Sequence, residues 1–395
     1  MKTYMFPGQG SQAKGMGAGL FERFPELCER ADAVLGYSIR ELCLEDPQER
    51  LGKTQYTQPA LYVVNALSGY ARIEDAGRPD FLAGHSLGEF NALLAAGCFD
   101  FETGLRLVQK RGELMGQVVG GGMAAVLNAS REQIEQILAD NGLSNLSLAN
   151  YNSPSQIVIS GLAEEIARAR ECFKQGKIRF YPLNTSGAFH SAYMRESMEA
   201  FRAFLQEFEF VSPAIPVIAN VSARPYQAGA LLDTLARQIA NTVQWSDSVQ
   251  YLLALAQARN EPIEFVELGP GEVLTRLVEA IRQQTPATRI EQILSEEKLA
   301  SAQRNAVEVP TPATIAPTVS APTQVGATPA HQLAAEGKIA HWNQQHPVGT
   351  AVRSKLLPEQ ALETRSEAVL LFGHRAAVYL KGYNGYFDLD ELSAA

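Results

Sequence analysis

One stretch of seven residues constrains this 395-residue chain more than any other: positions 84–90 are Gly-His-Ser-Leu-Gly-Glu-Phe. The apolar residues 81–83 predict a short strand before it, and residues 91–96 predict a helix after it. A strand, a sharp Gly-x-Ser-x-Gly turn and a helix form a nucleophile elbow, which would hold Ser86 exposed in a strained turn. The helix would direct backbone N–H groups towards an oxyanion above the Ser86 oxygen. In the alternative interpretation, Ser86 only caps the helix.

The segments around this turn predict an α/β fold. We expect strands near residues 4–6, 215–221 and 263–268, and helices within 18–46 and over 56–72, 101–118 and 193–208. Strands that alternate with helices favour a mostly parallel sheet with helices on both faces and catalytic loops at the carboxyl ends of the strands. We therefore expect an α/β-hydrolase-like catalytic domain formed by residues 1–121 and 194–296.

Residues 122–193 predict a compact insert in this core. The expected elements are a strand at 122–127, a helix at 130–141, strands at 146–149 and 156–160, a helix at 163–174 and a strand at 178–183. Ser130 followed by Gln133 matches a capping box at the start of the first helix. The β-α-β-β-α-β order is typical of a ferredoxin-like subdomain.

The composition changes near residue 300. Residues 297–338 are rich in Pro, Ala and Thr, with five prolines between positions 301 and 332, which predicts an extended linker. A short helix over 333–342 and strands at 349–353, 368–372 and 376–380 predict a small β domain over 339–395, with an SH3-like barrel as one candidate. This domain could be a docking module or only a stabilising appendage.

Composition argues against several classes of protein. A formal net charge of −9 argues against nucleic acid as the main partner. No run of about 18 apolar residues predicts a membrane span, and the first residues, soon interrupted by Pro7, are too short for a signal peptide. The four cysteines show no metal-ligand or disulfide spacing. We therefore expect a soluble cytoplasmic protein without a metal.

A serine nucleophile needs a general base. Of the six histidines, only His85 and His190 precede the predicted linker. His85 is adjacent to Ser86, and neighbouring side chains in an extended turn point apart, so His190 is the candidate base; otherwise it is a structural histidine in a turn. No acid stands out as the third member of a triad, and a backbone carbonyl could orient the imidazole instead.

Two further features concern ligand binding. The Gly-rich loop 7–12 lacks the Gly-Lys-Ser/Thr of a phosphate loop and the later strand and acid of a dinucleotide site. We expect this loop to bring a backbone N–H towards a ligand.

Arg111 lies at the flank of the apolar face of the predicted helix 101–118. An arginine in that place packs its stem and extends its head into water, unless the guanidinium binds a ligand.

Six motifs resemble, in order and spacing, those of the malonyl-CoA:acyl-carrier-protein transacylases. They are Phe6–Gln12, Gly84–Glu89, Gln109–Met115, Gly187–Ser191, Asn220–Ala223 and Glu267–Leu274. The resemblance covers residues 1 to about 290. With its tail beyond that domain, the chain most resembles free-standing acyltransferases that serve polyketide synthases in trans, and fatty acid synthesis enzymes are a close second.

The resemblance implies roles for matched residues. Ser86 would be the nucleophile and His190 the general base. The backbone N–H groups of Gln9 and Leu87 would form the oxyanion hole. Arg111 would form a bidentate pair with the malonyl carboxylate.

Further positions follow from the same resemblance. The main-chain carbonyl of Gln238 would hold the imidazole of His190, whereas Asn220 matches a strand end and has no assigned role. Phe189 and Leu87 resemble malonyl-selective members, in which bulk would crowd an α-methyl group. Gly187 departs from the histidine often found two places before that phenylalanine.

The implied activity is acyl transfer: a malonyl group would pass from malonyl-CoA through a serine ester to the phosphopantetheine thiol of an acyl carrier protein, without a cofactor. Two alternatives stay open. One is an acyl hydrolase of the same fold, against which Arg111 argues because such relatives lack it. The other is a non-catalytic scaffold that binds carrier proteins. We expect a monomer whose partners are malonyl-CoA and carrier protein domains, with neither nucleic acid nor a membrane among them.

Overall fold

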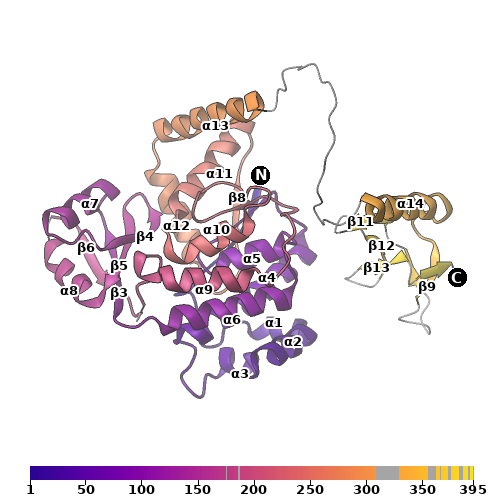
Figure 1. The fold of residues 1–395 in the computed structure, drawn as a ribbon, viewed down its shortest axis with the longest axis horizontal. Coiled ribbons are helices and arrows are strands. Elements are labelled where there is room, and N and C mark those ends of the chain that lie inside the picture. Colours follow the sequence, from indigo (N-terminus) through magenta and orange to yellow (C-terminus); the bar gives the residue numbers. More distant parts are fainter. Residues whose placement is uncertain are drawn as a thin grey trace, which may run out of the picture. The chain divides into compact units, whose positions relative to one another are not determined.

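The computed structural model describes residues 1–174, 176–185, 187–307, 329–354, 362–364, 366–371, 375–381, 386–389 and 392–394. The chain divides into two compact units, Met1–Val309 and Pro310–Ala395 (Figure 1). The first unit contains all the candidate site residues. Within the described residues, no helix is both long and apolar enough to cross a membrane.

A four-stranded parallel sheet forms the centre of the first unit, as the alternation of strands and helices predicts. Its strands are β1 (Lys2–Phe6), β2 (Phe81–Gly84), β7 (Val217–Ile218) and β8 (Glu264–Glu267), in the order β7-β2-β1-β8. Phe6 at the end of β1 is paired with Gly84 at the end of β2. The Gly-rich loop therefore leaves the sheet beside the turn that contains Ser86.

Side chains of β1 alternate between two apolar cores. Tyr4 and Phe6 join the core of α4 (Thr54–Ala76), α5 (Gly88–Ala95) and α6 (Phe101–Gln117). Met5 joins the core of α11 (Trp245–Arg259) and α12 (Val273–Gln284). This alternation is that of a strand buried on both faces, so helices cover both sides of the sheet, as predicted (Figure 1).

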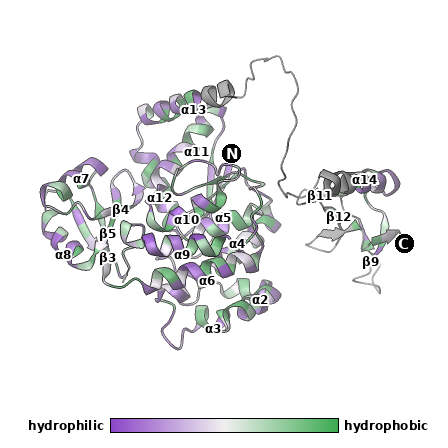
Figure 2. Ribbon diagram, in the orientation of Figure 1, coloured by the Kyte–Doolittle hydropathy of each residue, from purple (hydrophilic) through white to green (hydrophobic). Residues whose placement is uncertain are grey.

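Further helices complete the first unit. They are α1 (Ala18–Arg23), α2 (Pro25–Leu35), α3 (Ile39–Leu44), α9 (Arg195–Leu205), α10 (Leu231–Arg237) and the 3-10 turns η1 (Ala192–Met194) and η2 (Gln238–Ala240). Helix α9 carries both hydrophilic and hydrophobic residues (Figure 2). Phe201 and Leu205 are buried, whereas Glu196 and Glu199 are exposed, so one side of this helix packs on the core.

The insert contains the predicted elements in the predicted order. They are β3 (Gly121–Leu127), α7 (Arg131–Asp140), β4 (Ser147–Ser153), β5 (Gln156–Leu162), α8 (Ala163–Cys172) and β6 (Arg179–Pro182). The strands pair antiparallel in the order β4-β5-β3-β6 and have an apolar core of their own. Ser130 and Gln133 form the predicted capping box. Strand β3 starts at Gly121, one residue before the predicted boundary.

The predicted start of the linker at residue 297 is wrong. Helix α13 (Ala287–Val307) continues through it, because residues 287–307 contain no Gly or Pro and are rich in Ala, Glu, Gln and Leu, which favour helix. Helix α14 (Pro329–Gln345) likewise begins inside the predicted linker, and Pro329 occupies a first helical position that tolerates proline. Residues 308–328 of the predicted linker lie outside the described residues.

The described strands of the second unit form two three-stranded antiparallel sheets. One contains β9 (Ala351–Ser354), β10 (Leu362–Glu363) and β14 (Leu392–Ala394), and the other β11 (Val369–Leu371), β12 (Arg375–Tyr379) and β13 (Tyr386–Asp388). The three strands predicted from the sequence correspond to β9, β11 and β12. Val352, Val378 and Leu380 share an apolar core, against which Trp342 of α14 packs.

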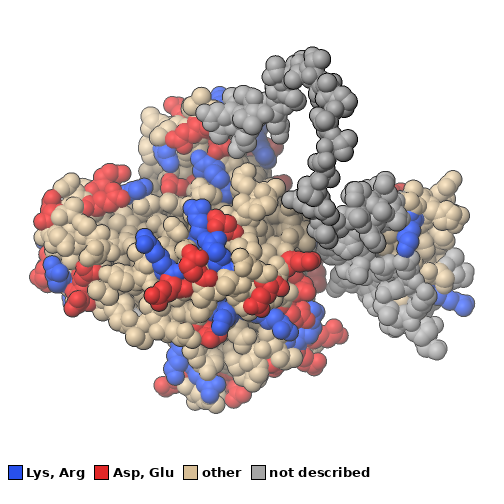
Figure 3. Space-filling view, in the orientation of Figure 1, with Lys and Arg blue, Asp and Glu red and all other residues tan. Residues whose placement is uncertain are grey.

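Acidic and basic side chains lie next to one another on the face shown in Figure 3. Among the described residues, Arg23 lies 2.8 Å from both Glu74 and Asp75, and Arg30 pairs with Glu102. Exposed pairs of this kind contribute little to the free energy of unfolding, because water screens them. The apolar cores therefore stabilise the fold much more than these surface pairs do.

Candidate active site

Ser86 lies in a sharp turn between β2 and α5. Its φ of 51° is in the left-handed region, which is strained for a residue other than glycine. The glycines on either side make the turn possible. A Cβ on Gly84 would lie 2.0 Å from the backbone of Gly88, and a Cβ on Gly88 would lie 1.9 Å from the Phe6 carbonyl oxygen. The strand, turn and helix predicted around Ser86 are therefore present.

Asn220, which follows β7, holds this turn from the neighbouring strand end. Its Oδ1 accepts a hydrogen bond from the Ser86 N–H at 2.7 Å, and its Nδ2 donates to the Gly84 carbonyl oxygen at 2.6 Å. Asn220 is buried. Because both contacts go to the backbone of the turn, they stabilise the strained conformation of Ser86.

His190 reaches Ser86 from a loop 104 residues further along the chain, and its Nε2 lies 2.8 Å from the Ser86 Oγ. Nδ1 lies 2.8 Å from the main-chain oxygen of Gln238 and 3.2 Å from that of Asn241. Donation from Nδ1–H to these carbonyls leaves Nε2 as the acceptor that faces the serine. Backbone carbonyls therefore orient the imidazole, which is the arrangement that the sequence left open.

The surroundings of His190 keep its imidazole neutral. His190 is buried, and desolvation together with the positive charge of Arg111 lowers its pKa to about 3. A neutral ring can accept a proton at any pH above that value. The position of the second histidine, His85, is also as predicted: its Nε2 lies 2.8 Å from Asn152 Oδ1, away from the Ser86–His190 pair.

Arg111 does not extend its head into water, because it is only 1% exposed. Nη2 donates to Ser86 Oγ at 3.0 Å and to Gln238 Oε1 at 2.8 Å, and Nη1 donates to Gln58 Oε1 at 2.8 Å. Burial lowers the pKa of Arg111 to about 10, so it stays cationic at neutral pH. These hydrogen-bond partners are all neutral, which leaves the charge of Arg111 available to an anionic ligand beside Ser86.

Glu89, in the first turn of α5, is fully buried behind the site. Its Oε1 accepts hydrogen bonds from the Asn220 N–H at 3.0 Å and the Tyr226 hydroxyl at 2.7 Å, and its Oε2 accepts one from Gln238 Nε2 at 2.5 Å. Desolvation raises the pKa of Glu89 to about 7, and the three donors oppose that rise. No role for Glu89 follows from the sequence alone.

Ser86, Arg111 and His190 line a cavity of about 340 Å³. Residues on its wall include Gln9, Ser86, Arg111, Met115, Met123, Phe189 and His190. Among the described residues, the backbone N–H groups of Gln9 and Leu87 donate to no protein acceptor. Both groups are therefore available to an oxyanion.

The position of Phe189 on this wall depends on Gly187. A Cβ on Gly187 would lie 2.1 Å from a carbon of the Phe189 ring, so a larger residue would displace the ring. Gly187 therefore leaves room for the Phe189 ring in the position that it has here.

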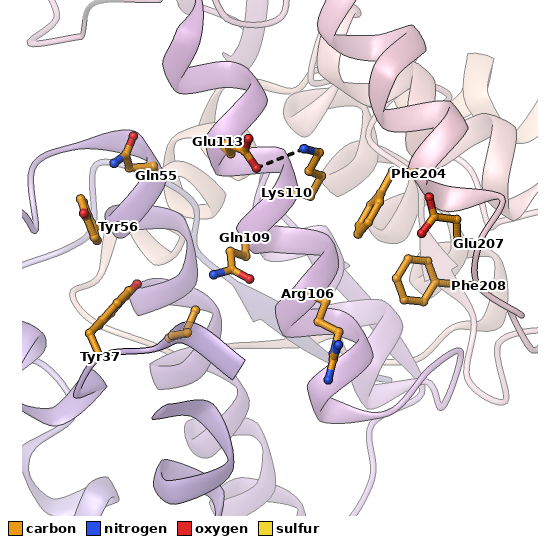
Figure 4. Close-up of a pocket in the computed structure, with 11 residues that line it drawn as sticks. Tyr37, Gln55, Tyr56, Arg106, Gln109, Lys110, Glu113, Phe204, Glu207 and Phe208 are labelled. Carbon is orange, nitrogen blue, oxygen red and sulfur yellow. Dashed lines mark hydrogen bonds and ion pairs between the residues drawn. The ribbon is translucent and has the colours of Figure 1, made fainter. Parts of the chain in front are cut away.

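A larger hollow of about 760 Å³ lies on the other side of α6 and contains none of the predicted site residues. Figure 4 shows the side chains of α6 that face it, with Lys110 bound to Glu113 at 3.1 Å. Gln109 and Lys110 line this hollow, whereas Arg111, the next residue, lines the cavity with Ser86. Successive residues of a helix are rotated by about 100°, which separates these side chains.

Comparison with known proteins decides the family. The sequence model of the acyl transferase domain family matches residues 3–320 of this chain. The polyketide biosynthesis malonyl CoA-acyl carrier protein transacylase BaeC of Bacillus velezensis is 53% identical over 291 residues, which are 73% of this chain and 99% of BaeC. The chain belongs to the acyl transferase family.

Other relatives differ in length and include solved structures. The polyketide biosynthesis protein PksE of Bacillus subtilis is 54% identical over 294 residues, which are 73% of this acyl transferase but only 38% of PksE. The crystal structure of a malonyl CoA-acyl carrier protein transacylase from Burkholderia pseudomallei is 64% identical, with a TM-score of 0.72, and covers 73% of this chain and 99% of its own. The structure of a malonyl-transacylase in complex with a type II PKS acyl-carrier protein is 33% identical, with a TM-score of 0.67. The match covers 75% of this chain and 99% of the malonyl-transacylase.

Several residues predicted for the site of this acyl transferase lie together, and other side chains that contact them were not predicted. Ser86, His190, Arg111 and the main chain of Gln238 meet at one point, as the predicted roles require. The side chains of Gln58, Glu89, Tyr226 and Gln238 were missed. The available signal was an acid at the start of the mostly apolar helix α5. In the described parts of the chain, no group of three or more His, Cys, Asp or Glu side chains could hold a metal ion.

Proposed function

We propose that this acyl transferase moves a malonyl group from malonyl-CoA to the phosphopantetheine thiol of an acyl carrier protein, for polyketide synthesis. One observation carries the proposal: the Ser86 hydroxyl lies 2.8 Å from His190 and 3.0 Å from Arg111 in one cavity. A nucleophile, a base and a fixed cation at one point suit an acyl donor that carries its own carboxylate. The similarity to BaeC, a polyketide biosynthesis malonyl CoA-acyl carrier protein transacylase, supports the choice of substrate and pathway.

In the first half-reaction, Ser86 Oγ attacks the thioester carbonyl of malonyl-CoA while His190 Nε2 takes the serine proton. The carbonyl oxygen becomes an oxyanion, which the N–H groups of Gln9 and Leu87 stabilise. The carbon–sulfur bond then breaks, the CoA sulfur takes the proton from His190, and a malonyl ester remains on Ser86.

In the second half-reaction, the phosphopantetheine thiol gives its proton to His190 and its sulfur attacks the ester. The bond to the Ser86 oxygen breaks, and the serine recovers its proton from His190. The carbonyls of Gln238 and Asn241 keep the other proton on Nδ1 throughout, so Nε2 serves both steps.

Arg111 gives the reaction its preference for a malonyl group. Its planar guanidinium can form two parallel hydrogen bonds to the malonyl carboxylate, with N–H groups other than the one that donates to Gln238. The bound carboxylate also offsets the positive field that lowers the pKa of His190, so the imidazole becomes a stronger base when the substrate is present. Phe189, which lines the cavity, would crowd an α-methyl group, whereas the side chain of Leu87 is buried and does not line the cavity.

Incubation with malonyl-CoA and a holo carrier protein tests this proposal. We expect malonyl carrier protein to form faster than free malonate. Faster release of malonate would instead favour an acyl hydrolase of the same fold. Failure to form a covalent malonyl adduct on Ser86 would favour a non-catalytic scaffold that binds carrier proteins.

We also propose an assignment of domains and location. Residues 1–121 and 194–307 form an α/β-hydrolase-like catalytic domain, which the parallel sheet supports. Residues 122–193 form a ferredoxin-like subdomain, which the order β4-β5-β3-β6 supports. Residues 339–395 form a small β domain, SH3-like in type, that docks a partner. The protein acts in the cytoplasm as a monomer.

A further inference from the structure

We propose that Glu89 is a positioning residue for Arg111: its carboxylate holds the side-chain amide of Gln238 in the orientation that offers an oxygen to the guanidinium. This inference rests on the proposed function, in which Arg111 binds the malonyl carboxylate. Gln238 lies between the two ionisable groups and contacts both of them. Glu89 therefore acts on the site through Gln238.

The contacts of the Gln238 amide fix which end faces Arg111. Nε2 donates to Glu89 Oε2 at 2.5 Å and to the Ser86 carbonyl oxygen at 2.7 Å, while Oε1 accepts from Arg111 Nη2 at 2.8 Å. A reversed amide would place its oxygen against the acceptor Glu89 and its NH₂ group against the donor Arg111. An ionised carboxylate only accepts hydrogen bonds, so it rejects the reversed amide and polarises the observed one.

The carboxylate is itself held in place from several elements. The Asn220 main-chain N–H and the Tyr226 hydroxyl both donate to Oε1, and Gln238 of η2 donates to Oε2. Glu89 also lies in the first turn of α5, where a helix favours negative charge. The three donors and the charge of Arg111 oppose the desolvation that raises the pKa of Glu89 to about 7, so Glu89 is a carboxylate above that pH.

The amide between the two charges explains how Arg111 can remain available to a substrate. A carboxylate in direct contact with the guanidinium would occupy the donors that the malonyl group needs. Gln238 transmits the attraction of Glu89 through one hydrogen bond. It leaves one Nη2–H directed at Ser86 and one Nη1–H directed at Gln58, while the Nε–H has no protein acceptor among the described residues. Glu89 therefore orients Arg111 without neutralising it by contact.

Replacement of the carboxylate by an amide tests the inference. In Glu89→Gln, we expect the ratio of kcat/KM for Ser86 loading by malonyl-CoA over acetyl-CoA to fall by about tenfold or more. Loading by acetyl-CoA, which does not need Arg111, should change little. Glu113→Gln makes the same chemical change on the exposed side of α6 and should leave the ratio unchanged.

A double-mutant cycle separates positioning from a general loss of stability. In Gln238→Met the amide is absent, so adding Glu89→Gln should cause no further fall in the ratio. In the wild type, the ratio should fall as pH drops through 7 and Glu89 is protonated, and in Glu89→Gln it should be flat. Arg111 stays charged and Tyr226 stays neutral over this range, because their pKa values lie well above it.

If Glu89→Gln does not fold, Tyr226→Phe provides the test. It removes a donor that lowers the pKa of Glu89, so the fall in the ratio should move to higher pH. A folded Glu89→Gln with the wild-type ratio, or a pH profile that Tyr226→Phe leaves unmoved, would overturn the inference. Absence of a malonyl adduct on wild-type Ser86 would overturn the proposed function instead.

Discussion

Arg111 is the side chain on which the choice of acyl group should depend. In Arg111→Ala, the malonyl carboxylate would enter a closed cavity without its cation. We expect kcat/KM for loading by malonyl-CoA to fall by about a hundredfold, as for a lost hydrogen bond between charged groups. Loading by acetyl-CoA should rise. Arg111→Lys keeps the charge without the planar fork and should be intermediate. Stopped-flow or quenched loading assays would measure both rates, and an unchanged preference in Arg111→Ala would remove Arg111 from the site.

The lowered pKa of His190 predicts an unusual pH profile. An ordinary histidine would be protonated below pH 6.5, and the rate would fall about tenfold by pH 5.5. In the folded protein the pKa is about 3, so kcat/KM for Ser86 loading by acetyl-CoA should stay flat between pH 7.5 and 5.5. A fall in this rate with a midpoint near pH 6.5 would contradict the neutral imidazole.

The same shift in pKa affects stability with a definite sign. Below pH 6.5 the unfolded chain binds a proton on His190 that the folded chain excludes, so this residue lowers the free energy of unfolding as pH falls from 6.5 towards 3. Glu89 acts in the opposite direction. Because the pKa of Glu89 is raised to about 7, its contribution to the free energy of unfolding decreases as pH rises from 4.5 to 7.

Residues in the motifs could be predicted from the sequence, whereas their supporting partners could not. Ser86 and His190 follow from the turn chemistry and from the small number of histidines. The contacts of Glu89 join it to Tyr226 and Gln238, which lie 137 and 149 residues away in the sequence. No local pattern predicts such contacts, because Tyr226 comes from the loop after β7 and Gln238 comes from the 3-10 turn η2.

At the scale of elements, the close approach of α5 to β1 depends on Gly88. A Cβ at this position would lie 1.9 Å from the Phe6 carbonyl oxygen, so Gly88→Ala must push α5 away from the sheet. We expect the free energy of unfolding to fall by about 2–4 kcal/mol in urea denaturation followed by circular dichroism. Loading of Ser86 should fall with it.

Gly19→Ala is the matched control for this substitution. Gly19 lies in α1, and a Cβ there would meet no atom within 4 Å. The change should be neutral or should stabilise the protein by about 0.5–1 kcal/mol, because alanine favours helix. Equal effects of the two substitutions would show that the contact between α5 and β1 is not the cause.

The elements of the first unit follow from the periodicity and turn residues of the sequence, but one boundary does not. Composition alone placed the end of the domain at residue 296, whereas α13 continues to Val307. The shift towards Ala and Thr does not stop a helix, and the first proline after Pro286 is Pro310. Proline, rather than composition, marks where this helix can no longer continue.

For the whole molecule, the two compact units predict that catalysis belongs to the first. A chain that ends after residue 307 keeps α13 and every residue named at the site. We expect it to load malonyl on Ser86 within about twofold of the full chain, because an intact site needs no contact from the second unit. Loss of loading in a truncated protein that is folded by circular dichroism would show that the second unit contributes to the reaction.

The most direct test of the central claim is the intact mass of the protein after separate exposure to malonyl-CoA, methylmalonyl-CoA and acetyl-CoA. The Ser86–His190–Arg111 arrangement predicts one malonyl adduct, located on Ser86 and absent in Ser86→Ala, with much less adduct from the other two donors. Equal labelling by all three donors, or a malonyl adduct that persists in Ser86→Ala, would contradict it.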